Sequence, residues 1–149
     1  MEARDFPILM IEDSEDDQIL IRRAFRRAQL ATPLLAVGDG DEAVAYLSGL
    51  GRYADRQAYP LPALALLDLK LPRRSGLEVL AWMRAQPSLK RIPVVVLTSS
   101  GESADIDRAY ELGANTYLTK PVSFDGLREM IGRLGAYWLM AELPRVGSA

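Results

Sequence analysis

Four short runs of apolar residues, uninterrupted by polar ones, constrain the fold more than any other feature of the chain. A strand with one solvated face alternates apolar and polar residues, whereas an unbroken run of roughly four to eight apolar residues is typical of a strand buried on both faces. A fifth run is more polar, as an edge strand would be. The five runs occupy residues 7–11, 33–37, 63–67, 93–97 and, for the polar one, 115–119.

Segments with the apolar spacing of helices separate these runs, as in Ile19, Leu20, Ala24, Phe25 and Ala28. Ser14 is expected to cap the first helix, with Asp17 three residues on, and Gly113 to follow the end of the fourth. The order of strand then helix repeats five times. This pattern predicts an α/β fold, a doubly wound parallel sheet with helices on both faces, which binds ligands at the carboxyl ends of its strands.

Composition limits the class of protein. The chain has 149 residues, 49% of them hydrophobic and 26% charged. This predicts a single domain over 1–149, with a core at about residues 6–142 and no output domain. No run approaches the roughly 20 apolar residues of a membrane span, and the acidic start is unlike a signal peptide. We therefore expect a cytoplasmic protein that binds no membrane, and the net charge of −2 gives no field for nucleic acid.

The chain contains no cysteine and no histidine. The first absence excludes disulfides and thiolate metal sites, and the second removes the usual general base and the usual zinc ligand. Any chemistry must therefore use carboxylates, hydroxyls, amines and a hard cation.

Acidic residues follow two of the predicted buried strands. Glu12 and Asp13 come directly after the first run, and Asp68 follows the third. Carboxylates that converge at one sheet edge repel one another, so they recruit protons or a cation. Mg²⁺ suits a site with two or three carboxylates because it prefers oxygen ligands and keeps several waters. We predict direct contacts from Asp13 and Asp68, a water-mediated one from Glu12, and a further oxygen from the Lys70 carbonyl.

Asp68 has a second role available. A carboxylate in line with a phosphoryl donor can act as a nucleophile and form an aspartyl phosphate. Thr98, at the end of the fourth run, could donate its hydroxyl to one phosphoryl oxygen, and Lys120 could neutralise another. The simpler alternative is that these acids are solvated loop residues, although their combination argues against it.

Five motifs in this order resemble the receiver domain of two-component response regulators. They are Ile11-Glu12-Asp13-Ser14, residues 67–72, Ser75-Gly76, Val96-Leu97-Thr98-Ser99 and Thr119-Lys120-Pro121. The resemblance implies a flavodoxin-like fold with strand order 2-1-3-4-5. It also implies that Asp68 accepts a phosphoryl group from a phosphohistidine of a sensor histidine kinase, with Mg²⁺ held by the acids.

Further expectations follow from the same resemblance. The bond from Lys120 to Pro121 should be cis, and Tyr117 should be an aromatic switch that becomes buried as Thr98 moves toward the phosphoryl group. A simpler interpretation of Tyr117 is an edge-strand residue that only packs. Residues 49–62, 68–76 and 137–144 are also similar to single-domain regulators that partner bacterial phytochrome kinases, so the cognate kinase could be a light sensor.

Two surfaces could contact other proteins. The last helix has a core stripe, and apolar residues Leu139, Met140 and Leu143 lie off it. They suggest a homodimer, although a helix end folded back onto its own domain would also explain them. The segment 22–27 has two pairs of arginines four residues apart, Arg22 with Arg26 and Arg23 with Arg27. These arginines form a basic stripe on the first helix, which is either a solvated face or a docking surface for the kinase.

Other functional classes remain open at this point. A phosphatase or phosphotransferase acting on small molecules would also use Asp68, but it usually needs a second acid where Lys70 stands. A flavodoxin-like electron carrier shares the strand order, yet its hydroxyl-rich and aromatic flavin loops are not found at these strand ends. We expect a switch that catalyses only its own phosphorylation and dephosphorylation, and not an enzyme with a substrate. A phosphate relay or sink, or a module that is not phosphorylated, is the alternative.

Overall fold

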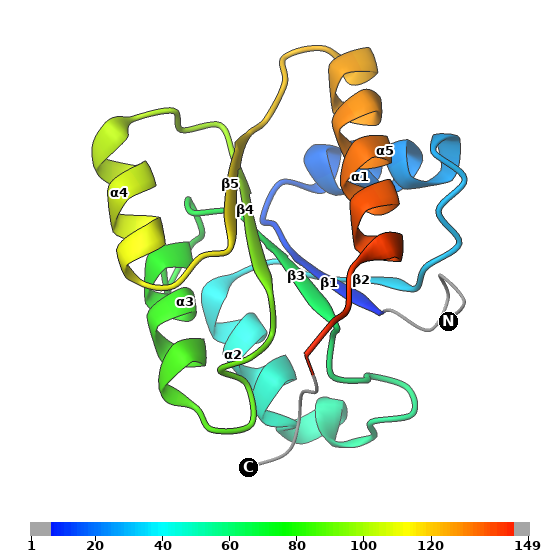
Figure 1. Cartoon of the computed structure of the whole chain (residues 1–149). Helices are drawn as coiled ribbons and strands as arrows, with labels where there is room; N and C mark the ends of the chain where they lie inside the picture. Colours follow the sequence, from blue (N-terminus) through cyan, green and yellow to red (C-terminus); the bar gives the residue numbers. More distant parts are fainter. Residues whose placement is uncertain (1–6, 145–149) are drawn as a thin grey trace.

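The computed structural model describes residues 7–144, which form one five-stranded parallel sheet (Figure 1). The sheet order is β2-β1-β3-β4-β5, which confirms the predicted doubly wound topology. The strands are β1 (Ile8–Ile11), β2 (Leu34–Val37), β3 (Leu64–Leu67), β4 (Val94–Thr98) and β5 (Thr116–Thr119). Each lies within one of the five runs or one residue beyond it.

Helices follow the strands in alternation and cover both faces of the sheet. α1 and α5 pack together on one face, and α2, α3 and α4 lie along the other (Figure 1). The helices are α1 (Glu15–Arg27), α2 (Gly40–Ser48), α3 (Gly76–Ala85), α4 (Ser103–Glu111) and α5 (Phe124–Met140), with a short 3-10 helix η2 (Gly51–Ala54) after α2. Within the described range, no helix is long and apolar enough to cross a membrane.

The unbroken apolar runs supply two cores at once because successive side chains of a strand point to opposite faces. In β1, Ile8 and Met10 pack in the core beneath α1 and α5, whereas Leu9 and Ile11 pack in the core on the side of α2 and α3. All four are buried. Both faces of this strand are therefore covered, as the pattern predicts.

Polar caps fix where the helices begin. The Ser14 side chain accepts a hydrogen bond from the Asp17 backbone N–H at 3.2 Å, which confirms the predicted cap of α1. Ser75 and Glu78 form a reciprocal capping box at the start of α3. These bonds satisfy N–H groups that have no partner within the helix. Both caps lie at the carboxyl edge of the sheet and hold the loops there in place.

The long connection after α2 is an ordered excursion rather than a loose loop. Tyr46, Tyr53 and Tyr59 form an aromatic cluster with ring centroids 5.0–6.0 Å apart. Arg56 donates to the carbonyls of Tyr46 and Leu47 at 2.8 and 2.9 Å, which satisfies the end of α2. Aromatic packing and capping thus fix a segment that has no regular periodicity.

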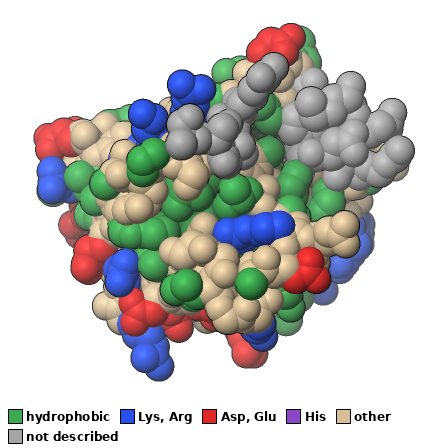
Figure 2. All heavy atoms as spheres, turned by 90° about the horizontal axis from the view of Figure 1, so that it is seen from below, with side chains coloured by type: hydrophobic (Ala, Val, Ile, Leu, Met, Phe, Trp, Pro, Cys, Tyr) green, Lys and Arg blue, Asp and Glu red, His purple; other side chains and the backbone are tan. Residues whose placement is uncertain are grey.

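The C-terminal segment folds back toward the amino ends of the strands. Leu143 lines a narrow apolar cavity together with Ile8, Leu64 and Trp138, so it packs against its own domain. Hydrophobic side chains gather on this face, which Figure 2 shows from below. Met140 is 86% exposed, and the side chain of Leu139 lies outside the described part of the structure. The exposed apolar surface at the end of α5 is thus smaller than the sequence predicts, because Leu143 does not contribute to it.

Candidate phosphoacceptor and metal site

The register of the parallel sheet brings the acidic residues together. Ile11 of β1 pairs with Leu67 of β3, so the next residues, Glu12 and Asp68, leave the sheet side by side. Carboxylate oxygens of Glu12, Asp13 and Asp68 all lie within 4.8 Å of one another. Glu12 and Asp68 are buried, and Asp13 is exposed at the mouth. A hard divalent cation fits this donor set, since it would be reached by three carboxylates and by solvent.

The two non-acidic residues reach the same point from β4 and β5. Thr98 pairs with Thr119, and the Lys120 backbone N–H donates to the Thr98 carbonyl at 2.7 Å. Lys120 therefore projects over the ends of the central strands. Its bond to Pro121 is trans, so the expected cis bond is wrong. Trans is the lower-energy form of such bonds, and the long Lys120 side chain reaches the acids from it.

Lys120 is the positive centre of the site. Its Nζ lies 2.5 Å from Glu12 Oε1, 2.7 Å from Asp17 Oδ2 and 2.9 Å from Asp68 Oδ2. The Lys120 side chain is 14% exposed, so these contacts are poorly screened by water. An ammonium group has three N–H donors, and here each has a carboxylate acceptor.

Asp68 is held at both carboxylate oxygens. Oδ1 accepts from the Thr98 hydroxyl at 2.7 Å and from the Lys70 backbone N–H at 3.2 Å, and Oδ2 accepts from Lys120. These donors orient the carboxylate and would equally serve oxygens of a group attached to it. The Lys70 carbonyl as a metal ligand stays a prediction.

Burial and hydrogen bonding separate the pKa values of the buried acids. Burial raises the pKa of Glu12 to about 7, although Lys120 and the Ser14 N–H partly oppose it. Burial also acts to raise the pKa of Asp68, but the hydrogen bonds from Thr98 and Lys120 outweigh it, so this pKa lies below the usual value. Burial lowers the pKa of Lys120, yet its three carboxylate partners raise it overall. Of these two buried acids, Asp68 is therefore the one whose surroundings favour the ionised form.

The loop after β4 connects the site to a tyrosine. The Tyr117 hydroxyl donates to the Ser100 carbonyl at 2.7 Å, and the tyrosine is half-buried. Ser100 donates in turn to Asp105 of α4 at 2.5 Å. Thr98 contacts Asp68, and Ser100, two residues further along the same loop, contacts Tyr117.

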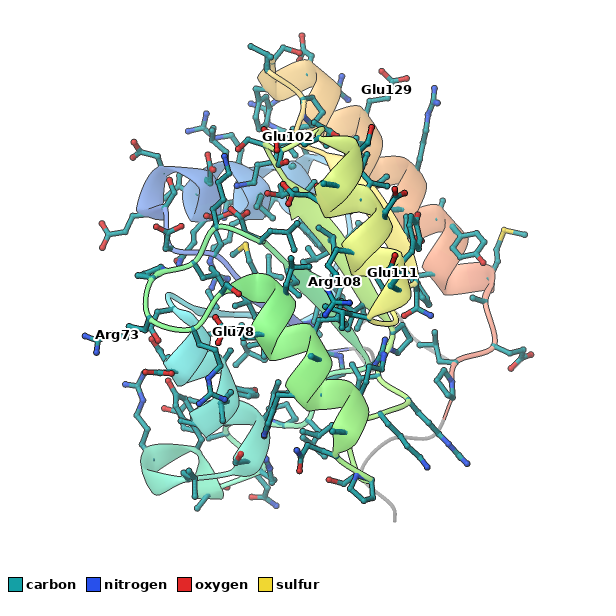
Figure 3. All side chains as sticks on the ribbon, turned by 90° about the vertical axis from the view of Figure 1, so that its left-hand side faces the viewer. Arg73, Glu78, Glu102, Arg108, Glu111 and Glu129 are labelled. Carbon is teal, nitrogen blue, oxygen red and sulfur yellow. The ribbon has the colours of Figure 1, made fainter. Side chains whose placement is uncertain are left out.

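The loop after β3 is tightly constrained beside Asp68. Arg73 has φ of 69°, a left-handed conformation that is unusual for arginine, and its side chain points away from the body of the protein (Figure 3). Its guanidinium is 3.5 Å from Asp39. At Gly76 the chain passes so close to Asp68 that a Cβ would lie 2.2 Å from the Asp68 carbonyl oxygen. Asp68 therefore lies on a backbone with no room for an added side chain at Gly76.

Asp17 is a site residue that the sequence pattern predicts only as part of a helix cap. Its contact with Lys120 joins residues 103 positions apart, which no local pattern reveals. An available signal was its position in the first turn of α1, directly above the carboxyl edge of the sheet. The structure adds it to the charged cluster.

The arrangement resembles that of known proteins. The model of the response regulator receiver domain matches residues 8–132. The chain is 41% identical over 132 residues to response regulator Rcp1 of Synechocystis sp. (strain ATCC 27184 / PCC 6803 / Kazusa), which covers 89% of this chain and 88% of Rcp1. The manganese-bound form of Rcp1 superposes with a TM-score of 0.84 at 40% identity, over 94% of this chain and 99% of that one.

Two further solved structures are similar over nearly the whole chain. The phosphorylated cyanobacterial phytochrome response regulator RcpA has a TM-score of 0.87 and 40% identity, covering 94% of this chain and 99% of RcpA. Response regulator RPA3017, from red light signalling in R. palustris, has a TM-score of 0.89 and 34% identity, covering 95% and 99% of the two chains.

Proposed function

Because the chain belongs to the response regulator receiver domain family, we propose that it accepts a phosphoryl group on Asp68 from the phosphohistidine of a sensor histidine kinase. The observation that carries this proposal is the set of donors around Asp68. Thr98 and Lys120 contact its two carboxylate oxygens at 2.7 and 2.9 Å. In the transfer, an Asp68 oxygen forms a bond to phosphorus as the bond from phosphorus to the kinase histidine nitrogen breaks.

The residues divide the work of this transfer. Thr98 and Lys120 are placed to donate to phosphoryl oxygens, which carry the charge that develops during transfer. Glu12, Asp13 and Asp68 fit Mg²⁺, and when bound this cation supplies neutralisation of phosphoryl charge. The manganese-bound form of the relative Rcp1 supports a divalent cation in this family. Without it, the acids repel an anionic donor.

A light-sensing kinase is the partner that we propose. RcpA is a phytochrome response regulator and RPA3017 belongs to red light signalling, and their similarity to this chain supports a bacterial phytochrome as the cognate kinase. Such a kinase would act on a cytoplasmic regulator. The assignment can be tested by incubating this protein with purified candidate phytochromes in red and in far-red light. The cognate kinase must transfer a labelled phosphoryl group to the wild type and not to Asp68→Asn.

The kinase is proposed to approach over α1 and the loop after β5. Val122 is fully exposed and lines a pocket there together with Phe124 and Lys120, and Ile19 of α1 is 55% exposed. Arg22 donates to the Leu34 carbonyl at 2.7 Å, so it is partly structural. Arg23, Arg26 and Arg27 are the exposed cations of the stripe. Reversal of Arg26 to glutamate should slow transfer from a kinase without slowing phosphorylation by acetyl phosphate.

A homodimer through the end of α5 remains our proposal for assembly. Tyr137 is 65% exposed and Met140 86% exposed, and together they place apolar surface on the outside of this helix. Two such patches related by a two-fold axis would cover each other. Sedimentation across a dilution series tests this. A monomer at all micromolar concentrations, in both phosphorylated and unphosphorylated protein, would contradict it.

Phosphorylation is proposed to act through Thr98 and Tyr117. A phosphoryl group adds nearly two negative charges and three acceptors, so it can hold Thr98 and the loop after β4. Thr98→Ala should still be phosphorylated on Asp68, but its change in partner affinity or assembly should be weakened. A full phosphorylation response in Thr98→Ala would rule out this coupling.

The deciding experiment is intact-mass measurement after incubation with Mg²⁺ and acetyl phosphate. The wild type should gain about 80 Da, the mass of one phosphoryl group, while Asp68→Asn and the chelator-treated wild type should not. No adduct under trapping conditions would instead favour a module that works without phosphorylation. Transfer onward to a second phosphotransfer protein would identify a relay rather than a terminal switch.

A further inference from the structure

Two overlapping sets of contacts compete at the carboxyl edge of the sheet. Lys120 Nζ contacts Glu12, Asp17 and Asp68, whereas the carboxylates placed to hold a cation are Glu12, Asp13 and Asp68. Glu12 and Asp68 belong to both sets. Asp17 belongs only to the Lys120 set, which sets it apart from the other acids.

Two of the three carboxylates that would hold a divalent cation, Glu12 and Asp68, are in contact with Lys120 in this structure. Lys120 lies 2.5 Å from Glu12 and 2.9 Å from Asp68, and a cation bound to these carboxylates would repel an ammonium held so close. Cation binding at Glu12 and Asp68 therefore weakens the contacts that these two carboxylates make with Lys120. The buried ammonium then needs another acceptor, because an unpaired buried charge is costly.

Asp17 is placed to be that acceptor. Its Oδ2 is already 2.7 Å from Nζ, and its backbone N–H is anchored to the Ser14 hydroxyl at the start of α1. The Asp17 side chain is 37% exposed, compared with 3% for Glu12. Asp17 thus lies at the rim, outside the cation set but within reach of Lys120.

We infer that Asp17 is a positioning residue, the carboxylate to which Lys120 withdraws when a divalent cation takes Glu12 and Asp68. The inference rests on the proposed Mg²⁺ dependence of the site. Asp17 lowers the cost of displacing the ammonium and keeps it at the rim, where it remains available to a phosphoryl oxygen. It touches neither the cation nor the phosphoryl group, and it acts through Lys120.

The test is Mg²⁺ affinity measured by titration calorimetry on the full chain, with thermal unfolding of each variant to confirm folding. Asp17→Asn should weaken Mg²⁺ binding about fivefold, the effect expected of a partly exposed ion pair. Asp16→Asn is the matched control, because Asp16 is the exposed acid next to it in the same helical turn. Asp16→Asn should change the Mg²⁺ affinity less than about twofold, and Asp17→Glu, which keeps a carboxylate, should retain most of the wild-type affinity.

The Asp17→Asn substitution made in a Lys120→Met background shows whether Asp17 acts by positioning Lys120 or only by its own negative charge. With no ammonium to displace, Asp17→Asn should alter Mg²⁺ affinity less than about twofold there. Equal losses in both backgrounds would mean that Asp17 acts only by its charge, and would overturn the inference, as would a loss no larger than that of Asp16→Asn. Failure of the wild type itself to bind Mg²⁺ would overturn the proposed function as well, and it is recognised without any variant.

Discussion

Replacement of Gly76 by alanine tests whether the backbone beside Asp68 is as crowded as the structure indicates. Gly76 is the first residue of α3, and its N–H donates to the Leu69 carbonyl at 3.0 Å. An added Cβ would lie 2.2 Å from the Asp68 carbonyl oxygen and 2.6 Å from Leu69 Cα. Its φ is not in the left-handed region, so alanine is excluded by lack of space alone. Both neighbours are backbone atoms, which cannot rotate aside.

The expected magnitude follows from this distance. Non-bonded atoms prefer separations of about 3.5 Å, so the two segments must move apart on the order of 1 Å. Overpacking costs about 1–3 kcal/mol and the weakened Leu69 hydrogen bond about 1 kcal/mol more. A total of about 2–4 kcal/mol lowers the melting temperature of a domain of this size by roughly 5–15 °C. Displacement of Asp68 by a similar distance should slow its phosphorylation about 100-fold.

Thermal unfolding and the rate of phosphorylation by acetyl phosphate measure the two effects separately. Gly132→Ala is the control, because a Cβ there meets only Ala28 Cβ at 3.8 Å. This substitution in the interior of α5 should stabilise the protein by up to about 1 kcal/mol and leave the rate unchanged. The reasoning fails if Gly76→Ala melts and reacts like the wild type. A destabilised Gly76→Ala with a normal rate would show that Asp68 is not displaced.

Three further predictions concern charge and hydrogen bonding. In the presence of a chelator, Lys120→Met should lower the free energy of unfolding by about 3 kcal/mol, because the buried carboxylates lose their positive partner. Added Mg²⁺ should restore most of the lost stability. Urea unfolding should show no such loss for the control variant Lys70→Met. In chelator the free energy of unfolding of the wild type should fall as the pH rises from about 4.5 to about 7, because the folded protein keeps a proton on Glu12 that the unfolded chain has lost. Glu12→Gln should reduce this dependence of stability on pH. Arg84 donates five hydrogen bonds to the segments that precede β4 and β5. Arg84→Met should therefore lower the free energy of unfolding by about 3 kcal/mol, measured by urea unfolding. Arg84→Lys should be destabilised as well, because an ammonium lacks the planar set of donors of a guanidinium.

Local patterns were sufficient for much of the fold. Apolar runs located all five strands because burial on both faces leaves a direct mark on composition, and Ser14 was identified as a cap from its own chemistry. The positions of Glu12 and Asp68 followed from the rule that parallel strands end at one edge. These features depend on neighbours along the chain or on topology.

Contacts between distant segments could not be predicted in the same way. Asp17 looked like an ordinary acidic residue in the first turn of a helix, and its contact with Lys120 depends on the exact height of α1 over the sheet. Leu143 was expected on the outside, but the chain turns after α5 and returns it to an apolar cavity. The bond before Pro121 was expected to be cis and is trans. Each outcome is decided by three-dimensional packing.

The contact between Lys120 and Glu12 also bears on how the protein folds, since the two residues are 108 positions apart. A chain that has formed β1 and β3 but has not yet added β5 holds Glu12 and Asp68 close together without their counter-charge. Such an intermediate must either bear their repulsion or take up a proton, and closing the long loop to bring in Lys120 relieves it. The cluster should therefore sharpen the cooperativity of folding, because partly folded chains that lack the last strand are penalised at the centre of the sheet.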